Sequence, residues 1–185
     1  MSLTSALDDE TVAAATSGDA EAIAVVYSVL APKVVGYLRA HGADDSEGLT
    51  NEVFLHVLRR LEGLVGGAAG LRTFVFSVAH ARLVDDVRRR ARRPVERAYD
   101  AELDDRLVPS AESAALADVD GEHLRGLLDQ LNDDQRAVIT LRVLGDLTIE
   151  QTADILGKTA GAVKQLQRRG LLTLRSLVDR EEVAR

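Results

Sequence analysis

The chain contains no cysteine and no tryptophan among its 185 residues. Without cysteine, disulfide scaffolds, thiolate nucleophiles and cysteine-based zinc sites are excluded. Aromatic residues are scarce, with three Tyr and three Phe, so a core must be built from Leu, Val, Ile and Ala. The remaining composition, 46% hydrophobic and 29% charged residues, is typical of a globular chain of one domain or two small ones.

Long apolar runs are also missing. No run approaches the ~20 apolar residues that a membrane-spanning helix requires. The N-terminus has neither the basic nor the apolar region of a secretory signal and reads MSLTSALDDETVAA. We therefore expect a cytoplasmic protein without membrane insertion.

Catalytic and metal-binding motifs are absent from the sequence as well. The glycines between residues 63 and 70 lack the Lys-Ser/Thr of a P-loop, and no HExxH spacing occurs. The acid pairs Asp85–Asp86 and Asp133–Asp134 are adjacent, and adjacent residues of a helix do not converge on one substrate. We expect no enzymatic activity, no metal and no cofactor. The histidines are scattered along the chain as His41, His56, His80 and His123.

What the chain does have is an uneven distribution of charge. Its formal net charge of −7 argues against nucleic-acid binding by the free protein. Yet residues 82–97 carry seven Arg against three acids, and residues 158–180 carry six basic residues against one acid. Acidic residues concentrate near the N-terminus and between residues 100 and 134. Two basic patches separated by an acidic stretch therefore need a functional explanation.

Helical periodicity dominates the sequence and strand signals are poor, which predicts an all-α fold. Pro32 is expected to interrupt the apolar pattern of residues 20–30 and to open a second helix over residues 33–42. The glycine- and alanine-rich residues 62–70 predict a loop. Residues 71–93 predict a buried helix whose C-terminal end is strongly basic.

The composition changes sharply at Pro94, and each side of this point has enough amphipathic helices to close a small core. We therefore predict an N-terminal tail over residues 1–19 and a first helical domain over residues 20–94. A flexible acidic linker is expected over residues 95–120. A second helical domain is expected over residues 121–185.

Residues 148–170 have the spacing of a helix-turn-helix and read TIEQTADILGKTAGAVKQLQRRG. Thr148 and Gln151 form a capping-box pattern, and Gly157 suits the left-handed conformation that ends a helix. Thr159 is expected to cap the second helix, whose outer side carries side chains able to contact base edges and phosphates. A plain helical hairpin with a solvated basic face is the alternative interpretation. The residues expected on the outer side or its edges are Ala160, Lys164, Gln165, Arg168 and Arg169.

Four segments occur in an order and rough spacing typical of one family. They read APKVVGYLRAHG, LTNEVFLHVLRRLE, TFVFSVAHARLVDDVRRR and LNDDQRAVITLRVLGDLTIEQTADILGKTAGAVKQLQRR. In these segments the chain resembles the extracytoplasmic-function (ECF) group of bacterial RNA polymerase sigma factors. The resemblance covers most of residues 20–178 except the linker.

The resemblance implies two helical domains with different tasks. The N-terminal domain is similar to sigma region 2, which in the family docks on the β′ clamp helices of core RNA polymerase and captures the melted −10 element. The C-terminal domain is similar to sigma region 4, whose helix-turn-helix reads the −35 element of promoter DNA and contacts the β flap. By the same analogy, an anti-sigma factor is expected to hold such a protein inactive.

The resemblance also assigns functional residues. The residues expected at −35 DNA are Arg142, Thr159, Lys164, Gln165, Arg168 and Arg169. Those expected at the polymerase clamp are Asn51, Glu52, Arg59 and Arg60. Those expected at −10 DNA are Arg72, Phe74, His80, Arg82, Arg88 and Arg89.

Two of these assignments differ from the usual family pattern in a way that matters. Phe74 stands where Trp is frequent, and His80 with Ala81 replaces a frequent Arg-Asn pair. The loop over residues 62–70 offers no aromatic side chain to stack on an unpaired base. For the Arg run at 88–90, a helix C-terminus stabilised by cations is an equally good interpretation.

Other functions remain possible from the residues alone. A stand-alone helix-turn-helix regulator would need a dimerisation surface for paired half-sites, and the sequence shows no long heptad seam. A helical adaptor without a DNA role would treat the basic helices as ordinary solvated faces. For the sigma interpretation, we expect the free protein to bind promoter DNA weakly, because its basic surfaces are local and screened beyond ~8 Å.

Overall fold

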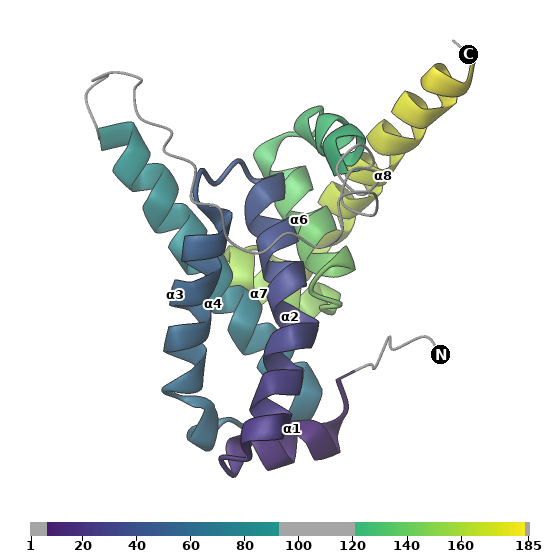
Figure 1. Cartoon of the computed structure of the whole chain (residues 1–185). Coiled ribbons are helices and arrows are strands. Elements are labelled where there is room, and N and C mark those ends of the chain that lie inside the picture. The colour runs from purple at the N-terminus through teal and green to yellow at the C-terminus, as the bar shows by residue number, and fades with distance from the viewer. Residues whose placement is uncertain (1–6, 93–120, 184–185) are drawn as a thin grey trace.

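The computed structural model describes residues 7–92 and 121–183, and every regular element in these two ranges is a helix. The predicted all-α fold is thus confirmed. The linker predicted over residues 95–120 lies outside the described residues. Two helical bundles form one compact body, from which the C-terminal ends of α4 and α8 project in different directions (Figure 1).

The first bundle consists of four α-helices and a short turn. Its elements are α1 (Asp9–Thr16), α2 (Ala20–Ala40), α3 (Ser46–Leu58), the 3-10 turn η1 (Leu61–Gly63) and α4 (Gly67–Arg92). The first three helices each begin after an aspartate, Asp8, Asp19 or Asp45, whose carboxylate accepts a backbone N–H at 2.7 Å. An N-terminal Asp satisfies free helical amides and favours the positive end of the helix dipole.

The structure differs from the predicted N-terminal tail. Residues 9–16 form α1, which packs against α2 and α4 and buries Val12 and Ala15. Asp9 Oδ1 accepts the backbone N–H of Ala68 at 2.8 Å, so α1 caps the first turn of α4. Sequence periodicity misses α1 because the helix is only two turns long and is stabilised by packing.

The prediction that Pro32 separates two helices is wrong, because α2 runs unbroken from Ala20 to Ala40. A proline inside a helix removes one backbone hydrogen bond and costs about 3 kcal/mol. Pro32 lies on the exposed side of α2, where water can reach the freed carbonyl. Leu30 and Val34 on the opposite side are fully buried, which holds both halves in line.

Helix α2 contains charged residues, so it is not an unbroken apolar run, yet by length and composition alone it could cross a membrane. The buried side chains of Val26, Leu30, Val34, Tyr37 and Leu38 account for its apolar character as part of the bundle core.

The predicted glycine loop is shorter than expected, because α4 already begins at Gly67. Gly66 and Gly67 both have positive φ, +92° and +57°. A Cβ on Gly70 would lie 2.2 Å from the carbonyl oxygen of Val65, so only glycine fits where α4 starts close to the preceding chain.

The second bundle contains a helical segment over residues 121–129, followed by α6 (Asp133–Val143), α7 (Ile149–Leu156) and α8 (Ala160–Val183). Asn132 and Gln135 form a capping box that starts α6, and Asp133 and Asp134 lie in its first turn. Helices α6, α7 and α8 share a buried cluster, to which they contribute Val138, Ala153 and Val163, respectively.

The two bundles dock directly on each other. Helix α6 contacts α2, and α7 contacts α4. Leu141 and Leu147, at most 1% exposed, join the same apolar cluster as Phe76 of α4. Gly145 allows this approach, since a Cβ there would lie 3.2 Å from the Phe76 ring. The second bundle therefore completes the core of the first.

Candidate nucleic-acid interface

Helix α7 and the first half of α8 form the predicted helix-turn-helix. Thr148 and Gln151 make the full capping box of α7. Gly157 ends α7 in the left-handed conformation, with φ 62° and ψ 34°. The Thr159 hydroxyl accepts the backbone N–H of Ala162 at 3.2 Å and so caps α8. All these local features of the motif are confirmed.

Packing fixes which side of α8 faces solvent. Val163 is fully buried, and Leu166 packs against the same cluster. Gly170 is buried against Ile139 of α6, where a Cβ would lie 3.2 Å from a side-chain carbon. With this side fixed inward, five of the residues predicted to contact −35 DNA are exposed. They are Thr159, Lys164, Gln165, Arg168 and Arg169.

Arg142 differs from these five residues. Its side chain is half-buried, its Nε donates to Gln167 Oε1 at 3.3 Å, and its guanidinium also donates to the carbonyl of Leu147. The structure thus places Arg142 between α6, the α6–α7 loop and α8. It ties these elements together rather than pointing freely into solvent.

Replacing Thr148 with alanine should destabilise the helix-turn-helix by about 1 kcal/mol, because the cap of α7 is lost. The measurement is the free energy of unfolding by urea, followed by circular dichroism. Thr173→Ala is the matched control: Thr173 lies within α8 and its hydroxyl bonds only the Arg169 carbonyl. An equal loss in both variants would contradict the role of the cap.

The residues predicted for polymerase lie on α3 and in the turn that follows it. Asn51, Glu52, Arg59 and Arg60 are all exposed. The Tyr27 hydroxyl donates to Asn51 Oδ1 at 3.3 Å. On the same helix Leu55 is 57% exposed.

Leu55 is a candidate that the sequence reasoning missed. Leu55 and Leu58 lie three residues apart on α3, so their exposed side chains add a small apolar patch to a polar surface. The available signal was that Leu55 falls outside the stripe formed by Leu49, Val53 and Val57. Leu58 on the same helix is 38% exposed.

The residues predicted for −10 DNA do not form one cluster. Arg72 is half-buried and lies 3.8 Å from Asp146 in the second bundle. His80 faces the second bundle, and its Nδ1 lies 2.9 Å from the hydroxyl of buried Tyr37. In this docked arrangement the second bundle therefore covers Arg72 and His80.

The other residues of this set lie elsewhere on α4. Phe74 is half-buried with its ring centroid 6.2 Å from that of His56. Arg82 lies 3.9 Å from Glu52 of α3. Partial desolvation and the charges of Arg60, Arg82 and Arg59 lower the pKa of His56. A positive potential thus surrounds the contact between α3 and α4.

The basic end of α4 has a partly structural role. Asp86 is buried and lies 2.6 Å from the Arg89 guanidinium and 2.9 Å from that of Arg90. Arg90 also donates to the Gly42 carbonyl at 2.8 Å, which ties the α2–α3 loop to α4. Arg88 is exposed and remains open to a phosphate.

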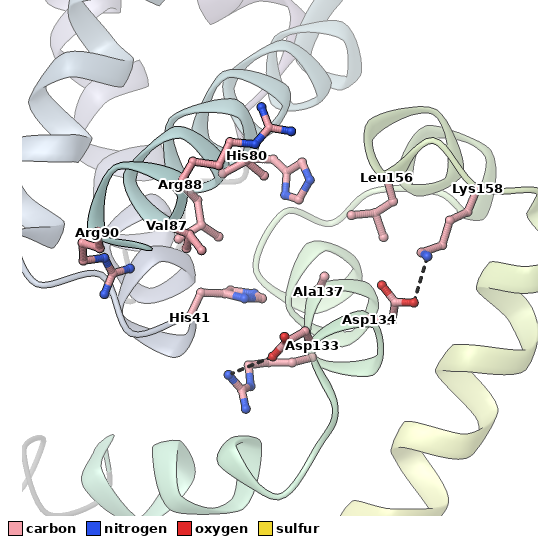
Figure 2. Close-up of a pocket in the computed structure, with 13 residues that line it drawn as sticks. His41, His80, Val87, Arg88, Arg90, Asp133, Asp134, Ala137, Leu156 and Lys158 are labelled. Atoms are coloured by element: carbon pink, nitrogen blue, oxygen red, sulfur yellow. Dashed lines mark hydrogen bonds and ion pairs between the residues drawn. The ribbon is translucent and has the colours of Figure 1, made fainter. Parts of the chain in front are cut away.

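A pocket of about 680 Å³ lies between the two bundles (Figure 2). His41 from the end of α2 points into it between α4 and α6, and His80 enters from α4. Burial, followed by the charge of Arg136 and by His80, lowers the pKa of His41 to about 4. Burial also lowers the pKa of His80.

Among residues 7–92 and 121–183, no three His, Cys, Asp or Glu side chains lie close enough together to hold a metal ion.

The second bundle thus presents a helix-turn-helix with an exposed basic face, a geometry that many DNA-binding proteins use. The family model "Sigma-70, region 4" matches residues 127–176. ShbA, an ECF RNA polymerase sigma factor of Streptomyces griseus, is 32% identical over 93% of this chain and 98% of its own length. The chain therefore belongs to the ECF RNA polymerase sigma factors.

Other relatives agree with this assignment. SigD of Mycobacterium tuberculosis is 34% identical over 90% of this chain and 82% of its own length. BldN of Streptomyces coelicolor is 31% identical over 91% of this chain, and the match spans 65% of BldN. A solved structure of CnrH in complex with the cytosolic domain of CnrY has a TM-score of 0.64 at 18% identity, covering 94% of this chain and 98% of that one, and supports the fold.

Proposed function

We propose that this sigma factor is the promoter-specificity subunit of bacterial RNA polymerase and directs transcription initiation in the cytoplasm. The observation that carries the proposal is the exposed face of α8, within the region matched as sigma region 4. Lys164, Gln165, Arg168 and Arg169 lie there on a rigid, capped helix, as base and phosphate contacts in a major groove require. A stand-alone regulator leaves the first bundle without a role.

The first bundle supplies the contact with polymerase. Asn51, Glu52, Arg59 and Arg60, with Leu55 between them, offer an exposed face that combines charge and apolar surface. We assign this face to the β′ clamp helices of the core enzyme, and the second bundle to the β flap. An anti-sigma factor that covers these faces would keep the protein inactive.

Promoter reading requires the two bundles to separate. Two helical turns of DNA already span ~70 Å, whereas a compact chain of this length has a radius of gyration of ~16 Å. Arg72 and His80, which we assign with Phe74, Arg82, Arg88 and Arg89 to the −10 element, are covered in the docked form. Docking on polymerase would hold the bundles apart and present both DNA faces at once.

The test is transcription in vitro from a promoter library, with core polymerase alone and with this protein added. We expect specific transcripts only when both are present, and co-purification of the protein with core polymerase. In a gel-shift assay, the free protein should bind the same promoters weakly and without selectivity. Tight, selective binding by a stable dimer of the free protein would instead support a stand-alone regulator.

A further inference from the structure

Two histidines lie at the junction of the docked bundles. His41 Nε2 is 3.1 Å from the hydroxyl of Thr140 on α6, a hydrogen bond between the bundles. The Thr140 hydroxyl also lies 2.8 Å from the Arg136 carbonyl, to which it donates. Since a hydroxyl has one proton, its oxygen accepts from His41 Nε2–H. The basic nitrogen of neutral His41 is then Nδ1.

Charged groups surround this position from every packed element. Arg88 and Arg90 come from α4, Arg136, Asp133 and Asp134 from α6, and Lys158 from the α7–α8 turn. The acids are already engaged, because Asp134 lies 2.8 Å from Lys158 and Asp133 lies 3.9 Å from Arg136. Among the described residues that line this pocket, neither carboxylate forms an ion pair with His41, and the main nearby charge that acts on His41 is the cation of Arg136.

His80 adds a second neutral contact beside the first. The Tyr37 hydroxyl is fully buried, and burial raises the pKa of Tyr37, so the hydroxyl keeps its proton and donates it to His80 Nδ1. The Tyr37 ring also packs against His41, with centroids 4.7 Å apart. A proton on either imidazole places a charge in a junction built for neutral rings.

We propose that the docked arrangement of the two bundles is closed by neutral His41 and His80, and that protonation of these histidines at mildly acidic pH separates the bundles. Separation uncovers Arg72 and His80 and frees the second bundle to move relative to the first. This pH dependence belongs to the free chain, and it stands whether or not the chain binds polymerase.

The direction follows from proton binding in the two forms. A solvated His41 in the open form has a pKa of ~6.5, against about 4 in the docked form. The open form therefore binds more protons, so docking is unaffected above pH ~6.5 and weakens as pH falls toward about 4. From His41 alone, the ratio of open to docked chains should rise ~10-fold between pH 7.5 and pH 5.5.

The experiment uses the absence of native cysteine. Cysteines introduced at exposed Glu62 and Asp154, one in each bundle, carry a donor and an acceptor dye for energy transfer. We expect transfer to fall as the pH of the full chain is lowered from 7.5 to 4.5. NMR titration of the imidazoles should show that His41 gains its proton over the same range.

Two variants distinguish protonation of the histidines at the junction from general effects of acid on the protein. His41→Gln keeps a donor for Thr140 but cannot be protonated, so its energy transfer should fall much less than that of the wild type. Any remaining fall should disappear when His80→Gln is added. His56→Gln replaces a histidine outside the junction and should show the same fall in energy transfer as the wild type. Circular dichroism checks that both variants fold. No fall in the wild type, or the same fall in His41→Gln, would overturn the proposal.

Discussion

Replacing Lys164 and Arg168 together with glutamate should lower transcription from promoters of this sigma factor by about 100-fold. Each good side-chain contact to a base edge is worth ~1–3 kcal/mol of discrimination, and ~1.4 kcal/mol is a factor of ten. Both side chains are exposed on the side of α8 opposite buried Val163. The measurement is multi-round transcription in vitro with saturating core polymerase, so that assembly of the holoenzyme is not limiting.

Arg175→Glu is the matched control for this experiment. Arg175 lies on the same helix beyond the helix-turn-helix and is exposed, 3.9 Å from Asp179. The Arg175→Glu substitution changes the charge of the protein in the same direction but leaves the proposed DNA-contacting residues of α8 unchanged. If Arg175→Glu alone lowered transcription as strongly as the double variant, long-range charge rather than local contact would be the cause.

Leu55→Asp should weaken binding to core polymerase by roughly 30-fold or more, which corresponds to the loss of ~2 kcal/mol at an interface anchor. Leu55 is 57% exposed in the free protein, so its replacement should leave the bundle folded. The measurement is the dissociation constant with core polymerase by fluorescence anisotropy in the absence of DNA.

The control keeps the same chemistry at another exposed position. Val65 is 84% exposed in the turn before α4, and Val65→Asp should bind core polymerase as the wild type does. Equal weakening by both substitutions would show that the α3 face does not determine binding. Unchanged binding by Leu55→Asp would remove Leu55 from the interface.

The parts of the fold that the sequence predicts well are stabilised by neighbours close in the chain. Thr148 and Gln151 cap each other three residues apart, and Gly157 reverses the chain by its own backbone freedom. Thr159 likewise caps α8 through an amide three residues later. Such contacts follow from residue type and spacing alone, so the helix-turn-helix and its outward face were predictable.

The parts that could not be predicted depend on distant contacts. Pro32 is tolerated only because other helices hold both halves of α2. Arg142 and Arg72 were assigned to DNA by their positions in motifs, yet each is engaged by protein groups that periodicity does not indicate. The docking of the bundles through Leu141 and Phe76 joins residues 65 positions apart, which no local pattern encodes.

The carboxylate of Asp9 reaches from the start of the chain to the amide of Ala68. The first turn of α4 is thus completed by a residue that precedes it by 59 positions. A polypeptide that started downstream of Asp9 would lack the carboxylate that accepts the Ala68 N–H in the first turn of α4. The choice of initiation codon for an expressed version of this protein therefore affects the start of α4 as well as the N-terminus.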